Sequence, residues 1–301
     1  MTSRRLDLLD PYEVASLGGI ELVARGVVEG FLSGLHRSPY RGFSVEFVEH
    51  RPYQPGDELR YLDWKILARR DRLYVKQFEE ETNLRATLVL DVSRSMGWSG
   101  RPDRLTKVAY AVRLAAALGY VLLRQRDATG LIAFDDDVRV TLPPKARSGQ
   151  WHLLAAALQG LEAGGGTAAE RALRRVTDVL RRRGMVFFVS DLLVERDLVL
   201  TALRYLRHRG HAVTVLHVMD PAEADLEPGR EARFVDPETG EGVVAAPRDL
   251  RRDYRATVEG VVRAWRRACR SSGIGYHHIT TVTPFGHALR RLAQGDGRAP
   301  R

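Results

Sequence analysis

The sequence predicts an α/β fold in which a mainly parallel sheet carries helices on both faces. From residue 85 onward, short apolar runs alternate with amphipathic helical patterns, and this alternation is typical of parallel strands joined by helices. The apolar runs 86–90 and 185–190 are each followed directly by an aspartate. Because ligands bind beyond the carboxyl ends of the strands in such sheets, these two aspartates mark the expected site.

The elements of this domain can be placed in chain order from their hydrophobic periods. Apolar residues recur at helical spacing over 104–125, and the runs 129–134 and 138–142 flank an acidic turn, which predicts a hairpin at the sheet edge. The later elements are expected as helices at 148–161 and 167–183, a strand at 185–190, a helix at 195–208, a strand at 212–218, a hairpin of 233–235 with 243–244, a helix at 248–271, a strand at 275–279 and a closing helix at 285–293.

Residues 1–84 follow a different pattern. One amphipathic helix is predicted by the apolar positions Ile20, Val23, Val27, Phe31 and Leu35. Short strands are then expected at 42–47, 60–64 and 73–78. We therefore expect three parts: an N-terminal segment of 1–84 that packs on the main domain, the main α/β domain of 85–285, and a closing helix and tail of 286–301.

The composition indicates a globular protein of the cytoplasm. Of the 301 residues, 44% are hydrophobic and 28% charged, which is ordinary for a globular chain. The one cysteine, Cys269, excludes an internal disulfide and lies on the apolar face of the helix 248–271, so we expect a core residue and not a nucleophile. We find no run of about 18 apolar residues and no signal-peptide core, and we therefore expect a cytoplasmic location.

Arginine accounts for much of the positive charge. The formal net charge is +9, and arginines concentrate in the predicted helices at 171–183 and 248–270. One interpretation is a solvated helical face. The other is attraction to nucleic acid, anionic membrane or an acidic protein, although the chain shows no zinc-finger spacing and no aromatic RNA-binding motif.

Three predicted loops at the carboxyl ends of the strands carry oxygen donors. Asp91, Ser93 and Ser95 follow the first apolar strand, Thr167 follows three glycines, and Asp191 ends the strand 185–190. Hard cations such as Mg²⁺ prefer oxygen ligands, with few carboxylates and some water. These five residues therefore predict a metal site, for Mg²⁺ first and Mn²⁺ as an alternative. The other interpretation is that the hydroxyls cap helices and the aspartates bond backbone groups.

A polar cluster also stands out in the N-terminal segment. It comprises Arg51, Tyr53, Asp57, Arg60, Asp63, Trp64 and Lys65. One interpretation is a docking surface for a partner. The other, which we favour, is a buried ion-pair network that attaches the segment to the sheet, since proline, glycine and paired charges define the turns of a short irregular β region.

Two sets of residues carry resemblances to known families. The Asp91-x-Ser93-x-Ser95 motif with Thr167 and Asp191 resembles a von Willebrand factor A domain with an intact metal-ion-dependent adhesion site. The preceding segment resembles the signature of the family called domain of unknown function 58, and the likeness covers about residues 18–285. Its matching positions are Ser38 to Gly42, Glu46-Phe47, Arg51 to Arg60, Asp63-Trp64-Lys65, Ala68-Arg69 and Leu73 to Lys76.

These resemblances imply a Rossmann-like sheet and a function in protein binding. In the adhesion-site pattern the hydroxyls and the two aspartates surround the cation, and an acidic side chain from a partner fills its open position. The family resemblance implies a bacterial or archaeal cytoplasmic protein that acts with a MoxR-type AAA+ ATPase in assembling or activating other complexes. Many relatives carry two N-terminal transmembrane helices, and this chain matches the branch without them.

We weigh this adaptor function against two others. One is a basic nucleic-acid-binding protein that uses the Arg-rich helices. The other is a metal-dependent hydrolase, but the chain has no Gly-x-Ser-x-Gly, His-Glu-x-x-His or phosphate-loop motif, and we expect no enzyme. His277 and His278 are adjacent on a predicted strand and face opposite ways, so we expect one at the surface and one in the core.

Overall fold

The computed structural model describes residues 20–33, 46–52, 73–79, 84–165, 169–226, 232–235, 242–245 and 247–294. The chain divides into two compact units. The smaller one is formed within residues 40–84, and the larger one takes the remainder of the chain.

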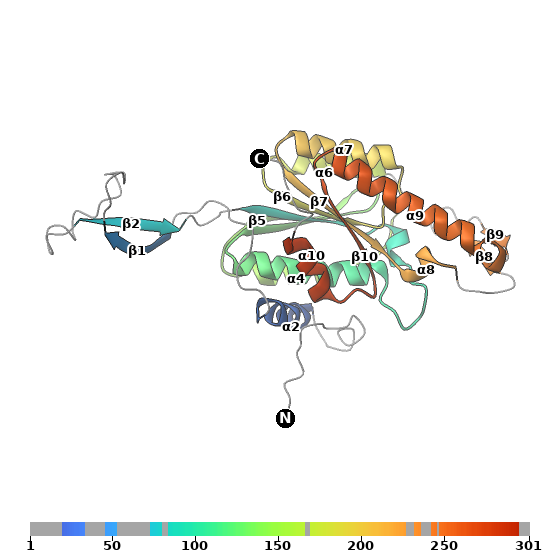
Figure 1. Ribbon diagram of the computed structural model, residues 1–301, viewed down its shortest axis with the longest axis horizontal. Helices are drawn as coiled ribbons and strands as arrows, with labels where there is room; N and C mark the ends of the chain where they lie inside the picture. The colour runs from blue at the N-terminus through green and yellow to red at the C-terminus, as the bar shows by residue number, and fades with distance from the viewer. Residues whose placement is uncertain are drawn as a thin grey trace, which may run out of the picture. The chain divides into compact units, whose positions relative to one another are not determined.

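A six-stranded sheet forms the centre of the larger unit (Figure 1). Its strands are β3 (Arg85–Asp91), β4 (Ala128–Phe134), β5 (Val138–Lys145), β6 (Met185–Ser190), β7 (Ala212–Met219) and β10 (Gly275–Thr280). They lie in the order β10-β7-β6-β3-β4-β5. All neighbours run parallel except β5, which pairs antiparallel with β4 at the edge. The predicted mainly parallel sheet and its edge hairpin are thus confirmed.

The central strand β3 is buried on both faces. Leu88 and Leu90 pack into one hydrophobic core and Val89 into the other, because successive side chains of a strand point to opposite faces. None of these three side chains is exposed to solvent. This two-sided burial explains why the sequence of the strand is a continuous apolar run and not an alternating one.

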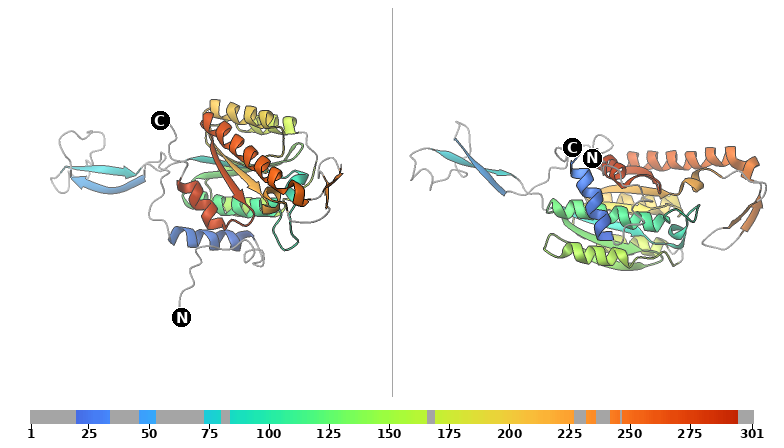
Figure 2. Two further views of the ribbon diagram at one scale, coloured as in Figure 1. Left: turned by 45° about the vertical axis from the view of Figure 1, so that its right-hand side comes forward. Right: turned by 90° about the horizontal axis from the view of Figure 1, so that it is seen from below.

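Helices cover both faces of the sheet, as predicted (Figures 1 and 2). On one face lie α2 (Ile20–Ser33), α4 (Lys107–Arg124), α5 (Gln150–Gln159) and α10 (Phe285–Gln294), and on the other α6 (Ala169–Val179), α7 (Arg196–His208) and α9 (Pro247–Ser271). Cys269 of α9 is fully buried in the second core. Burial raises the pKa of its thiol to about 12, so the prediction of a core cysteine is confirmed.

The helix α2 belongs to the larger unit, although its sequence pattern predicted that it would belong with residues 1–84. It packs against α4 (Figure 2) and buries the apolar side chains of Val23, Ala24, Val27 and Val28. Burying such side chains contributes about 1–3 kcal/mol each. Leu35, which was predicted to belong to the same stripe, lies outside the described residues.

The smaller unit contributes one antiparallel pair of strands. These are β1 (Glu46–Pro52) and β2 (Tyr74–Glu79), with a register shift between Phe47 and Glu49. They overlap two of the three predicted strands. The third, at 60–64, lies outside the described residues.

Three further short features complete the fold. The predicted hairpin is confirmed as β8 (Ala232–Val235) paired with β9 (Gly242–Ala245). The 3₁₀ helix η2 (Arg94–Gly97) and the helix α8 (Pro221–Ala224) were not predicted. Within the described ranges, no helix combines the length and the apolar character needed to cross a bilayer.

Candidate functional site

The carboxyl ends of β3 and β6 bring two aspartates together. Asp91 is the last residue of β3, and Asp191 follows the last residue of β6. These two strands are neighbours in the sheet, and the aspartates are 3% and 2% exposed. The structure thus places the two predicted carboxylates at one buried edge, as the topology rule for parallel sheets requires.

Serine residues hold the carboxylate of Asp91. The backbone N–H of Ser93 donates to Oδ1 at 2.9 Å, and the hydroxyl of Ser190 donates to Oδ2 at 2.6 Å. The Ser190 hydroxyl also accepts from the N–H of Leu192 at 3.0 Å. Ser190 was not predicted from the sequence, because its contact with Asp91 depends on the register of β3 against β6. Its one sequence signal is its position directly before Asp191.

The other two predicted serines lie beside this pair. Ser93 and Ser95 are buried, and their hydroxyl oxygens are 3.2 Å apart. Each hydroxyl keeps a lone pair that is free to bind a cation. Thr167, the fifth predicted ligand, lies outside the described residues.

The glycine turn before Thr167 is described in part. Gly165 has a left-handed φ of 73°, and the N–H of Gly164 donates to the carbonyl of Val92 at 2.9 Å. A Cβ on Gly165 would lie 2.3 Å from Oδ2 of Asp135. Glycine is therefore needed here both for its backbone angle and for the close approach of a buried carboxylate.

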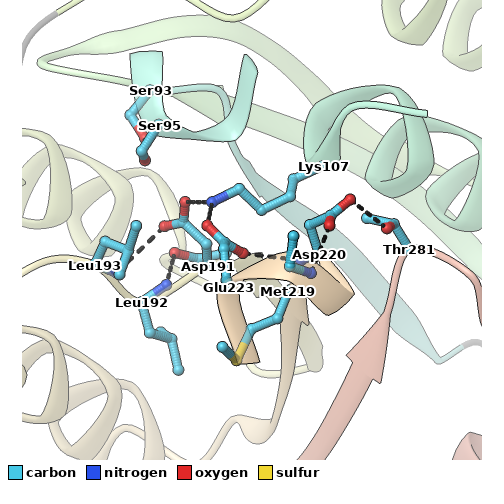
Figure 3. A network of polar contacts seen from close by, with 12 residues as sticks. Ser93, Ser95, Lys107, Asp191, Leu192, Leu193, Met219, Asp220, Glu223 and Thr281 are labelled. Atoms are coloured by element: carbon cyan, nitrogen blue, oxygen red, sulfur yellow. Dashed lines mark hydrogen bonds and ion pairs between the residues drawn. The ribbon is translucent and has the colours of Figure 1, made fainter. Parts of the chain in front are cut away.

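A buried lysine bonds Asp191 from the first turn of α4 (Figure 3). The Nζ of Lys107 donates to Oδ2 of Asp191 at 2.7 Å and also to the carboxylate of Glu223. The Lys107 and Asp191 side chains are each 1% exposed. Burial lowers the pKa of Lys107, but the two carboxylates outweigh burial and hold this pKa above its usual value. The other oxygen of Asp191 accepts from the N–H of Leu193 at 3.2 Å.

The same network extends to the start of α8 (Figure 3). Asp220 and Glu223 form a capping box, in which the Glu223 carboxylate accepts from the Asp220 N–H at 2.8 Å. The Asp220 carboxylate also accepts from Arg104 at 3.2 Å and from Thr281 at 3.1 Å. The sequence Asp220-Pro221-x-Glu223 is a helix-start signal that could have revealed this capping box.

Negative charge exceeds positive charge in this part of the molecule. The carboxylates are those of Asp91, Asp191, Asp220 and Glu223, and the cationic partners are Lys107 and Arg104. Burial and then the charge of Asp191 raise the pKa of Asp91 to about 6, although hydrogen bonds from Ser190 and Ser93 oppose this shift. A cation beside Asp91 would stabilise the ionised carboxylate and so oppose both the burial and the repulsion by Asp191 that raise this pKa.

The described residues fit a hard divalent cation by their donor chemistry. They offer two carboxylates and two neutral hydroxyls, which are oxygen ligands of the kind Mg²⁺ prefers. No cluster of three or more His, Cys, Asp or Glu in the described ranges could hold a metal ion. A cation here would therefore depend on the serine hydroxyls, and the metal site stays a prediction.

The polar cluster of the N-terminal segment is described only at Arg51. This residue lies on β1, and its side chain is not described. Tyr53, Asp57, Arg60, Asp63, Trp64 and Lys65 lie outside the described residues. The choice between a docking surface and an ion-pair network stays a prediction.

The histidines of β10 differ from the expectation. His277 and His278 are both half-buried, so the prediction of one surface and one core residue is wrong. The reason is that β10 is an edge strand of the sheet. Among the described residues the buried histidines are instead His211 and His217. The Nδ1 of His217, which lies on β7, is 2.6 Å from the hydroxyl of Tyr276. Burial lowers the pKa of His217 to about 3.

Comparison with known proteins places this chain in a family. The family described as "Protein of unknown function DUF58" matches residues 49–261. The chain belongs to this family. Among its relatives is the uncharacterized protein Rv1480 of Mycobacterium tuberculosis, which is 30% identical over 243 residues, or 78% of this chain and 74% of the relative. The uncharacterized protein Mb1516 of Mycobacterium bovis matches to the same extent.

Solved structures with a similar arrangement are more distant in sequence. The conserved hypothetical protein BatB from Bacteroides thetaiotaomicron is 18% identical, with a TM-score of 0.45 over 70% of this chain and 96% of that one. The VWA domain of SpRpn10 is 12% identical, with a TM-score of 0.39 over 72% of this chain and 100% of that domain.

Proposed function

We propose that this DUF58 protein is a metal-dependent protein-binding adaptor. Asp91, Ser93, Ser95, Thr167 and Asp191 would hold the cation, Mg²⁺ or alternatively Mn²⁺. The observation that carries this proposal is the buried pair of Asp91 and Asp191 beside two hydroxyls, with the pKa of Asp91 raised to about 6. A bound cation would stabilise such a pair, because it neutralises the negative charge of the two carboxylates.

The chain's own residues would tune this site toward acidic partners. A bound cation supplies a Lewis-acidic position that a partner's carboxylate completes. Lys107 holds Asp191 in place and neutralises part of its charge, and the serine hydroxyls carry no charge at all. Because few negative charges then face the cation, much of its positive charge remains for the partner's carboxylate. We propose binding, and not catalysis, as the outcome.

The partner that we propose is a MoxR-type AAA+ ATPase or one of its client proteins. This choice rests on the family resemblance. The interaction would take place in the cytoplasm, where a lone buried thiol such as Cys269 stays reduced.

Direct metal binding tests the first half of this proposal. Titration of the full chain with Mn²⁺, followed by electron paramagnetic resonance, should show one site that Mg²⁺ competes for. Ser95→Ala and Asp91→Asn should each weaken Mn²⁺ binding by about tenfold or more, as loss of one ligand contact implies. Ser99→Ala is the matched control, because within the described part of the chain the Ser99 hydroxyl donates to the nearby carbonyl of Arg101 and to no other group. Unchanged Mn²⁺ binding in both site variants would contradict the proposed ligands.

Affinity capture tests the second half. Wild type, Ser95→Ala and Asp191→Ala serve as baits in native cytoplasmic extract, each with Mg²⁺ and with chelator. The proposal is supported if a AAA+ ATPase is captured only by the wild type and only in the presence of Mg²⁺. Capture of the same proteins by every bait, with Mg²⁺ and with chelator, would show that the site at the ends of β3 and β6 does not bind them.

One observation favours nucleic acid as a second candidate. A groove of about 420 Å³ between α7 and α9 is lined by Arg196, Arg204 and Arg267, together with Asp197. Binding of nucleic acid there would fall steeply with salt, because counterions are released from the phosphates, and would not respond to chelator. An electrophoretic mobility assay at two salt concentrations, with and without chelator, separates the two functions.

A further inference from the structure

A second hollow adjoins the candidate site. It is a groove of about 520 Å³ between α2, α4 and the end of α5. Gly97 and Ala163 line it, and these residues belong to the same two loops that carry Ser95 and lead to Thr167. Its lining combines aliphatic and polar residues. The larger aliphatic ones are Ile20, Val23, Val112, Leu158 and Leu161, and the polar ones include Thr106, Gln159 and Glu162.

Arg113 places a cation in the lining of this groove. Its Nη1 donates to the carbonyl of Ala109 at 3.0 Å, and its Nε is buried without a hydrogen-bond partner among the described residues. Burial lowers the pKa of Arg113. Glu162 also lines the groove but is exposed, and within the described part of the chain no ion pair joins it to Arg113.

A guanidinium in the lining of a groove has a definite chemical preference. A carboxylate is the acceptor that matches a guanidinium best. The aliphatic lining residues favour an apolar side chain at the same time. The groove is therefore complementary to a segment that offers both groups.

We infer that this groove binds a segment of the protein partner in which an apolar side chain stands beside an acidic one. The apolar side chain fills the space between α2 and α4, and the carboxylate accepts from Arg113. This inference rests on the proposed function, because the loops that border the groove also carry the candidate metal ligands. A second acidic residue of the same segment would reach the cation.

A peptide selection on the full chain tests the inference without knowledge of the partner. Random dodecapeptides on phage are panned against the wild type in Mg²⁺, and the most enriched peptide is synthesised with a fluorophore. Its affinity is measured by anisotropy for Ala109→Trp, which fills the groove, and for Arg113→Gln. The matched controls are Ala256→Trp, at an exposed position of α9, and Arg124→Gln, at the exposed end of α4.

The inference predicts enriched peptides that pair apolar with acidic residues. Each groove variant should lose about tenfold or more in affinity, the equivalent of one charge-assisted contact, and each control should stay near the wild type. An affinity equal to that of the wild type in both groove variants, or enrichment of peptides without this pattern, would overturn the inference. Urea unfolding of every variant verifies that the fold is retained.

Chelator separates this inference from the proposed function. Binding that is lost in chelator but unchanged in both groove variants would overturn the groove and support the metal site. Binding that is lost in the groove variants but unchanged in chelator would support the groove and contradict metal-dependent binding.

Discussion

Replacing Lys107 with methionine removes the buried cation that bonds Asp191 and Glu223, while the length of the side chain is kept. Lys107 is 1% exposed, and its Nζ lies 2.7 Å from Asp191. At this distance and an effective dielectric constant of about 20, the Coulomb attraction is about 6 kcal/mol. Desolvation of the two ions offsets part of this, and removing one member of such a buried pair costs about 3–5 kcal/mol.

We therefore expect the Lys107→Met variant to lose about 3–5 kcal/mol of unfolding free energy in urea, measured in chelator at neutral pH. Lys145→Met, at an exposed position of β5, is the control and should change little. Adding Glu223→Gln to Lys107→Met should recover part of the loss, because one unpaired buried carboxylate is then neutral. A loss below about 1 kcal/mol, the range of a surface ion pair, would refute the reasoning.

Two further predictions concern the same edge of the sheet. The folded protein holds the proton of Asp91 more tightly than the unfolded chain does, since its pKa is raised from 3.8 to about 6. The metal-free protein should therefore lose about 2 kcal/mol of unfolding free energy as the pH rises from 4 to 8, and Asp91→Asn should abolish most of this loss in urea titrations in chelator. Gly165→Ala should lower the unfolding free energy by about 1–3 kcal/mol, because the new Cβ would lie 2.3 Å from the Asp135 carboxylate at a left-handed backbone angle. Gly164→Ala, whose Cβ meets nothing within 4 Å, should lower the unfolding free energy less. Thermal unfolding of both variants measures the difference, and equal losses of unfolding free energy would contradict the argument.

The sequence by itself determined the layers of the fold and the place of the site. Continuous apolar runs identified strands buried on both faces, and helical periods between them identified the covering helices. The topology of parallel sheets then placed Asp91 and Asp191 at one edge, because the carboxyl ends of parallel strands lie on the same side. Local signals of this kind need no knowledge of which residues meet across the fold.

Tertiary structure alone decided the partners of those aspartates. Lys107 is 84 residues from Asp191 and 116 from Glu223, and Ser190 is 99 residues from Asp91. These contacts depend on the register of β3 against β6 and on how the start of α4 packs over the strand ends, which no local pattern specifies. The Nε of Arg113, which is buried without a hydrogen-bond partner among the described residues, likewise became visible only once α2 had been placed against α4. A hydrophobic period shows which face of a helix is buried, but the atoms that meet each polar group depend on the packing of elements distant in the chain.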